Sequence, residues 1–212
     1  MRPITVYTFG DSALDCGRYN EFGLNPGRLI VENDDERFPE FRGQDLVAIS
    51  PARLDHRARD GSLARDLPRQ AQGLAAQDAA VAQVSVGGND LIDGLVTDAG
   101  PGFTVFANTL DAFLHDLPIR PVLVANVYDP TRGRDDADGF GWDPVLARAG
   151  HRRINQMIAT IASRYGAVVD IHGHFLTGDS GWFTALIEPS LRGASEISRC
   201  FLPHVRMALG LQ

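Results

Sequence analysis

A serine near the N-terminus follows directly on an apolar run and is the first residue that could do chemistry. The run at residues 4–9 ends in Gly10, Asp11 and Ser12. A serine hydroxyl becomes an effective nucleophile where the backbone turns sharply at the end of a buried strand and leaves Oγ accessible. Gly-Asp-Ser is also ordinary turn chemistry. The position nevertheless makes Ser12 a candidate nucleophile for covalent catalysis.

A second candidate block, Gly87-Gly88-Asn89-Asp90, follows the apolar run at residues 81–86. A Gly-Gly pair lets the backbone bend tightly, and the Asn89 amide can donate a hydrogen bond to a developing oxyanion. The alternative role for Asn89 is to cap the next helix. Because the ends of adjacent parallel strands face one crevice, we expect Ser12 and Asn89 to converge there.

A third block, Asp60-Gly61-Ser62, stands between a weaker β-rich run and a helical pattern. Glycine has no side chain to block close approach, so the Gly61 N–H could point toward the same oxyanion. Asp-Gly is also a common turn dipeptide. Gly61 is therefore the third candidate for the site.

The elements that would position these residues alternate between strand and helix. Such alternation predicts an α/β fold with a parallel sheet covered on both faces. The predicted strands are residues 4–9, 52–58, 81–86, 121–127 and 167–171. The predicted helices are residues 63–74, 91–117 with a break at 99–102, 143–165 and 193–209. Residues 23–43 and 129–141 are predicted to be irregular and could form walls of a binding site.

The composition is that of an ordinary globular protein with one domain over residues 1–212. The net charge of -7 argues against a nucleic-acid partner, because such proteins gather positive charge. No apolar run approaches membrane-spanning length and no targeting segment is evident, so we expect a cytoplasmic protein without a membrane partner. Cys16 and Cys200 are expected to be free thiols. The sequence is silent on oligomeric state.

The three blocks, in this order and each at a strand end, resemble those of the GDSL or SGNH hydrolase family over essentially the whole chain. The resemblance implies that Ser12 attacks the acyl carbonyl of a small ester. The Ser12 N–H, the Gly61 N–H and the Asn89 side chain would hold the oxyanion. The implied fold is a three-layer α/β/α sandwich around a five-stranded parallel sheet of flavodoxin-like order. No cofactor or metal is implied.

The last block departs from the family pattern, which reads Asp, two residues, His and Pro, then a Gly entering the terminal helix. Here Glu188 stands at the histidine position and Ala185 at the aspartate position, while Pro189 and Gly193 align. A carboxylate can act as general base if burial raises its pKa toward neutrality. The alternative is a structural role for Glu188, pairing with Arg192 or accepting bonds at the start of the helix.

A histidine from the end of the fifth strand is the competing base. If residues 170–174 remain extended, Asp170, His172 and His174 share one face, and Asp170 could orient an imidazole, with His174 as the candidate base. The alternative is that both histidines only form hydrogen bonds at the surface or in the core. His172 and His174 could together ligate a metal ion, but the sequence shows no third ligand at a suitable spacing.

Two further readings remain open. The chain could have lost hydrolysis and kept the pocket to bind a small acyl or glycan ligand, or it could be an acyltransferase. Trp142 and Trp182 lie beside glycine-rich loops and could form an apolar acyl or alkyl site or pack under those loops.

Overall fold

Five parallel strands form the central sheet of the computed structural model, which describes residues 3–134 and 141–211. The strands are β1 (Ile4–Gly10), β2 (Ala52–His56), β3 (Ala80–Ser85), β4 (Val122–Ala125) and β5 (Gly166–Val169). Their order is β2-β1-β3-β4-β5, and every neighbouring pair is parallel. The five predicted strands and the flavodoxin-like order are confirmed.

Alternation along the strands supplies two cores, one on each face of the sheet. In β1, Val6 faces one core, while Tyr7 and Phe9 belong to the other. Both faces are apolar because helices cover both, as expected for a parallel sheet. The carboxyl ends of β1 and β3 lie side by side at the centre of this sheet, with Gly10 opposite Ser85.

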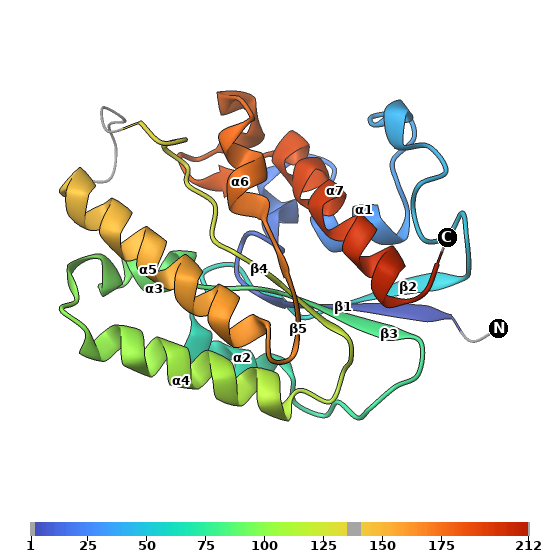
Figure 1. The fold of residues 1–212 in the computed structure, drawn as a ribbon. Coiled ribbons are helices and arrows are strands. Elements are labelled where there is room, and N and C mark those ends of the chain that lie inside the picture. Colours follow the sequence, from blue (N-terminus) through green and yellow to red (C-terminus); the bar gives the residue numbers. More distant parts are fainter. Residues whose placement is uncertain (1–2, 135–140, 212) are drawn as a thin grey trace.

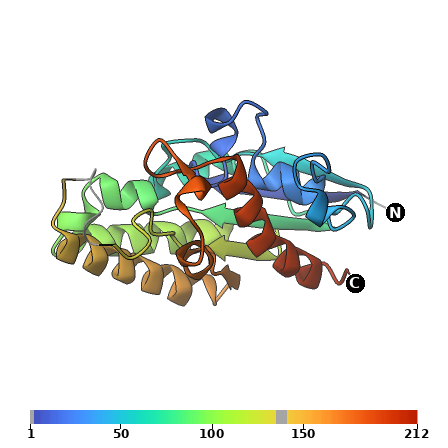
Figure 2. The same ribbon diagram turned by 90° about the horizontal axis from the view of Figure 1, so that it is seen from above.

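Helices cover the sheet on both faces and complete three layers (Figure 1). One face carries α1 (Pro26–Val31), α6 (Ile171–Leu176) and α7 (Leu191–Ala208). The other carries α2 (Leu67–Gln70), α3 (Gly88–Ile92), α4 (Pro101–Asp116) and α5 (Pro144–Ala162). Seen from above, α7 lies on the viewer's side of the sheet (Figure 2). The predicted α/β/α sandwich is confirmed.

Short elements complete the described chain. They are the 3-10 helices η1 (Cys16–Tyr19), η2 (Pro39–Phe41), η3 (Ala64–Asp66), η4 (Leu95–Thr97) and η5 (Ser180–Trp182), and a hairpin of β6 (Phe183–Thr184) and β7 (Glu188–Pro189). None of the described helices has the length and apolar character needed to cross a membrane.

Two predicted segments differ from the structure. Residues 23–43, predicted to be irregular, contain α1, whose start is set by the Asn25 side chain accepting from the Arg28 N–H and by Pro26 in the first turn. The helix predicted over 63–74 is shorter, as η3 followed by α2. Of the stretch predicted to be irregular at 129–141, residues 135–140 lie outside the described residues, and 129–134 form turns.

Candidate active site

Ser12 lies in a turn that the end of β1 makes against β3. Gly10 has φ of +122°, and a Cβ there would lie 1.7 Å from the Ser85 carbonyl oxygen, so only glycine fits. The Asp11 N–H donates to that same oxygen at 3.1 Å. The Asp11 carboxylate accepts from the Ala13 N–H at 3.1 Å and the Ser85 hydroxyl at 3.4 Å. These bonds fix the turn and present Ser12 to the adjoining pocket.

The predicted oxyanion donors come from three separate strand ends. Within the described residues, the N–H groups of Ser12 and Gly61 have no hydrogen-bond acceptor. Gly61 takes a φ of +77°, which glycine adopts without strain. The Asn89 amide donates to the Ser62 carbonyl at 3.0 Å, and its second N–H is left for another acceptor. Asn89 therefore does not cap α3, whose N-cap is Gly87.

Gln70 ties these blocks together, and the sequence offered no signal for it. Its Oε1 accepts from the Gly10 N–H at 2.7 Å, and its Nε2 donates to the Gly10 carbonyl at 2.9 Å and the Ser62 hydroxyl at 3.1 Å. One amide thus fixes the end of β1 relative to the turn that contains Gly61. We call Gln70 with these three bonds the Gln70 clamp.

A second set of bonds holds the other side of the Gly61 turn. Asp15 Oδ2 accepts from the Asp60 N–H at 2.9 Å, while its Oδ1 lies 2.9 Å from His56 Nε2. His56 Nδ1 in turn lies 2.7 Å from the Thr8 hydroxyl oxygen. The His56 hydrogen bond and the Asp60 N–H lower the pKa of Asp15, although burial opposes them. The Asp15 carboxylate is therefore anionic at neutral pH.

Glu188 lies beside Ser12. The Glu188 carboxyl is buried in β7, and the Ser12 hydroxyl acts on its pKa as a hydrogen-bonding neighbour. Burial raises the pKa of Glu188, and the charge of Asp60 adds to that effect, while the Ser12 hydrogen bond and Arg18 oppose it. Glu188 Oε2 is buried without a partner among the described residues. The arrangement is that of a hydroxyl beside a carboxylate of raised basicity.

The segment around Glu188 is held by the β6–β7 hairpin and its neighbours. Thr184 pairs with Glu188 across the hairpin, and the Tyr128 hydroxyl donates to the Ile187 carbonyl at 2.7 Å. Ala185 and Leu186 make the tight connection with φ of 45° and 73°. The alternative role predicted for Glu188, pairing with Arg192, is absent, because Arg192 pairs with Asp179 at 3.1 Å.

His174 has a different partner from the one predicted. Residues 171–176 form α6, capped by the Asp170 side chain at the Gly173 N–H, so the condition under which Asp170, His172 and His174 would share one face is not met. Two residues apart on a helix point to different faces. His174 Nε2 lies 2.8 Å from Glu196 Oε2, and its ring lies 5.0 Å from that of Trp182. His174 is not among the residues that line the pocket containing Ser12.

His172 does line that pocket, beside His151, with ring centroids 4.7 Å apart. His151 Nε2 lies 2.8 Å from the Val127 carbonyl oxygen. Burial lowers the pKa of His151, and the neighbouring His172 lowers it further. In the part of the chain that the structure describes, no group of three or more His, Cys, Asp or Glu side chains could hold a metal ion.

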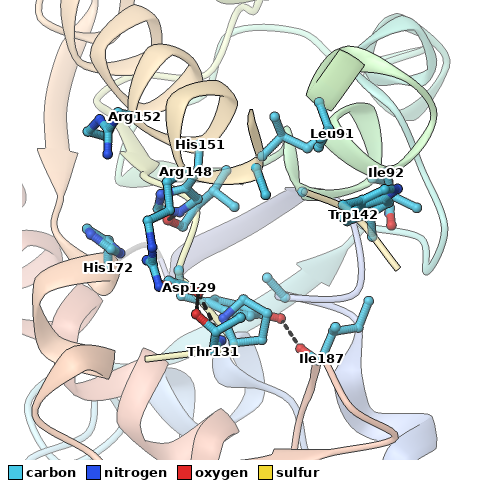
Figure 3. Close-up of a pocket in the computed structure, with 18 of the residues that line it drawn as sticks. Leu91, Ile92, Asp129, Thr131, Trp142, Arg148, His151, Arg152, His172 and Ile187 are labelled. Carbon is cyan, nitrogen blue, oxygen red and sulfur yellow. Dashed lines mark hydrogen bonds and ion pairs between the residues drawn. The ribbon is translucent and has the colours of Figure 1, made fainter. Parts of the chain in front are cut away.

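The pocket itself has a volume of about 380 Å³ and extends from Ser12 and Asn89 to the first turns of α5. Figure 3 shows Leu91, Ile92 and Trp142 on one wall, and a polar wall that holds Arg148, His151, Arg152 and His172, with Asp129 below them. Of the two tryptophans considered from sequence, Trp142 lines the pocket, while Trp182 is buried against Phe175. The walls contributed by α5 and α6 were not identified from sequence.

Comparisons with solved structures find similar folds in several proteins. An alpha/beta hydrolase enzyme from the metagenome of Lake Arreo, Spain, matches with TM-score 0.67 and 22% identity, covering 95% of this chain and 94% of that one. An acetylxylan esterase from Geobacillus stearothermophilus matches with TM-score 0.69 and 16% identity, with the same coverage. A lipase/acylhydrolase from Enterococcus faecalis matches with TM-score 0.65 and 14% identity, covering 98% and 96%.

At these identities the likeness establishes the fold, and the fold predicted from the GDSL or SGNH resemblance is confirmed. No protein-family model matches the sequence, and no curated protein matches it.

Proposed function

We propose that this chain is a serine hydrolase of the GDSL or SGNH type that cleaves an acyl ester through a Ser12 acyl-enzyme. The observation that carries the proposal is the buried Glu188 carboxylate beside the buried Ser12 hydroxyl, which acts on the pKa of Glu188. The N–H groups of Ser12 and Gly61, which lack acceptors within the described residues, support it. The shared fold of esterases and an acylhydrolase adds support at the level of architecture.

In the first half of the reaction, Ser12 Oγ attacks the ester carbonyl carbon while Glu188 takes the hydroxyl proton. The carbonyl π electrons move onto oxygen, and the Ser12, Gly61 and Asn89 N–H groups stabilise the oxyanion. These donors are fixed before substrate arrives, so little reorganisation is needed when charge develops. Collapse of the tetrahedral intermediate breaks the C–O bond, and the alcohol leaves with the proton from Glu188.

The second half repeats the chemistry with water. Glu188 removes a proton from water as the water oxygen attacks the acyl-Ser12 carbonyl. The tetrahedral intermediate then expels Ser12 Oγ, which recovers its proton from Glu188, and the carboxylic acid departs. Ser12 and Glu188 return to their starting states.

A carboxylate base explains how the site could work without an aspartate at position 185. Structures of catalytic mutants of the Geobacillus esterase replace a serine in one case and a histidine in another by alanine. An imidazole base becomes a cation and needs an anionic partner that orients and stabilises it. Glu188 instead becomes neutral when protonated, and the β6–β7 hairpin and Tyr128 hold it in place. Ala185 is consistent with that difference.

The test is covalent labelling by a fluorophosphonate together with hydrolysis of p-nitrophenyl esters. We expect the probe to modify Ser12, identified by peptide mass spectrometry, and Ser12→Ala to abolish both labelling and hydrolysis. Ser50→Ala, at a buried serine outside the site, is the matched control and should retain both. Failure of the wild type to label and to hydrolyse any ester would overturn the proposal. Labelling without turnover in water would contradict hydrolysis and favour acyl transfer or ligand binding.

A further inference from the structure

The cavity beside Ser12 has two chemically different walls (Figure 3). Leu91, Ile92 and Trp142 stand together on one side, with Val96 and Ala147 contributing further apolar lining. On the polar side, Arg148 pairs with Asp129 at 3.2 Å, and His151 bonds to the Val127 carbonyl. Some polar groups of the polar wall therefore already have hydrogen-bond or ion-pair partners in the protein. The apolar wall instead offers surface that an apolar group would cover.

Some of the apolar side chains in and beside the lining are exposed. Ile92 and Leu176 line the cavity, and each keeps 44% of its surface exposed. Leu186 is 65% exposed and stands next to the lining residue Ile187. Its left-handed backbone, with φ of 73°, is unusual for leucine. Exposed large apolar side chains gathered at a pocket mark ligand-binding surfaces more often than scattered ones do.

We propose that this apolar wall binds an aliphatic chain of about four to eight carbons carried by the ester, a range consistent with pockets of this size. The inference rests on the function proposed for Ser12 and names the substrate class of that site. The chain belongs to either the acyl or the alcohol side of the ester, since both leave the same carbonyl beside Ser12.

The size of the cavity separates this proposal from an acetyl-only site. At about 380 Å³ it lies at the lower end of the range for small-molecule pockets. An acetyl group has three heavy atoms and would leave most of that volume to water against Leu91, Val96 and Trp142. A longer chain replaces that water and removes apolar surface from it, which is favourable in proportion to the area covered.

Two ester series measure the chain preference. One holds p-nitrophenol constant and lengthens the acyl group from acetate through butyrate and hexanoate to octanoate. The other holds acetate constant and lengthens the alcohol from ethanol to octanol. Hydrolysis in this series is measured by pH-stat titration. In one series we expect kcat/KM to rise about fourfold for each methylene that enters the apolar wall. The series that rises identifies which side of the ester carries the chain.

A pair of alanines on α5 supplies matched variants. Ala147 lines the cavity, whereas Ala149 is exposed and outside it. Ala147→Phe should fill the apolar wall and lower the octanoate-to-acetate or octyl-to-ethyl ratio of kcat/KM by more than about tenfold, the effect of two buried methylenes. Ala149→Phe should leave that ratio unchanged. Leu176→Ser, at the exposed rim, should also lower the ratio and serves if Ala147→Phe does not fold.

The outcomes separate this inference from the one on which it rests. If acetate esters are hydrolysed through Ser12 but both series are flat or fall with chain length, the chain site is wrong and the hydrolase proposal stands. If no ester of any length is hydrolysed and Ser12 does not label, the hydrolase proposal itself fails. A rising series whose ratio is unaffected by both Ala147→Phe and Leu176→Ser would place the chain elsewhere and overturn the assignment to this wall.

Discussion

The two halves of the candidate site are built in different ways. The half with Ser12, Gly61 and Asn89 is assembled from strand ends of the central sheet and closed by the Gln70 clamp. The half with Glu188 lies off that sheet, in a two-stranded hairpin anchored by Tyr128. We call these the donor half and the base half.

The difference shows where the fold constrains chemistry and where it leaves freedom. In the donor half the approach of β3 to Gly10 forbids any side chain there. In the base half the connection contains two non-glycine residues with positive φ, and a buried Glu188 oxygen has no partner within the described chain. The sheet fixes the donors, while a short hairpin alone sets which side chain faces Ser12. A change of base is therefore possible without a change of fold.

The largest effect on activity is expected from a substitution in the base half. Glu188→Gln keeps the shape of the side chain but removes its ability to take a proton, and we expect kcat/KM to fall by about 10²- to 10⁴-fold. His174→Ala, which breaks the bond to Glu196, should leave kcat/KM within about twofold, because His174 pairs with Glu196 and Glu188 is the carboxylate beside Ser12. Steady-state hydrolysis of a p-nitrophenyl ester measures both.

The pH profile of the same enzymes identifies the group that titrates. Glu188 must be ionised to act as base, so activity should rise with pH through its pKa, which burial raises above the ordinary value for glutamate. His174→Ala should leave this limb in place. A large loss in His174→Ala with normal activity in Glu188→Gln would reverse the assignment of the base.

The next largest effect on activity is expected when one oxyanion donor is removed. Asn89→Ala removes an amide that the structure holds against the Ser62 carbonyl, and we expect kcat to fall about 10²- to 10³-fold with little change in KM. Asp93→Ala, at an exposed residue one turn along, is the control and should keep full activity. A change confined to KM would show that Asn89 binds the ground state and does not stabilise an oxyanion.

The donor half was also the more predictable one. Glycines at Gly10 and Gly87 mark places where a strand ends in a left-handed turn, and the strands themselves follow from apolar runs. Local sequence carries both signals. Ser12, Gly61 and Asn89 thus lie where strand-end reasoning put them, and their catalytic roles stay predictions.

Features set by tertiary contacts could not be predicted in the same way. The Gly173 N–H donates to the Asp170 carboxylate, and this cap starts α6 directly after β5, which competes with the strand alternation that linked Asp170 to His174. The Gln70 clamp was equally invisible, because a glutamine on a short helix has no local pattern that indicates a partner sixty residues away. Both depend on tertiary contacts.

A smaller effect tests whether the clamp matters. Gln70→Leu keeps similar bulk but removes three hydrogen bonds and leaves the Gly10 N–H without its acceptor. We expect the free energy of unfolding to fall by about 2–3 kcal/mol. A shift of the Gly61 turn should lower kcat by about tenfold. Gln72→Leu, at an exposed site, is the control for both measurements. Loss of stability with unchanged kcat would make the clamp purely structural.

A separate effect, on stability alone, concerns Asp11, a buried carboxyl of the donor half. Burial raises the pKa of Asp11 to about 7; the Ala13 N–H opposes this, and the charges of Asp90 and Glu188 add to it. An unfolded aspartate titrates near 3.9, so between about pH 4 and 7 the folded protein binds more protons than the unfolded chain. The free energy of unfolding should therefore fall as pH rises through this window.

Asp11→Asn isolates this contribution, because an asparagine Oδ1 can still accept from Ala13 and Ser85. Urea unfolding from pH 4.5 to 8 should show a shallower decline than in the wild type, with the variant the more stable above pH 7. Asp93→Asn, exposed on the same side of the sheet, should leave the slope unchanged. Equal slopes in wild type and Asp11→Asn would contradict the raised pKa.

Glu188→Gln offers the sharper measurement, because loss of the Glu188 charge lowers the pKa of Asp11 and moves the decline in the free energy of unfolding to lower pH. Such a shift would show that the two halves interact electrostatically although different parts of the fold build them.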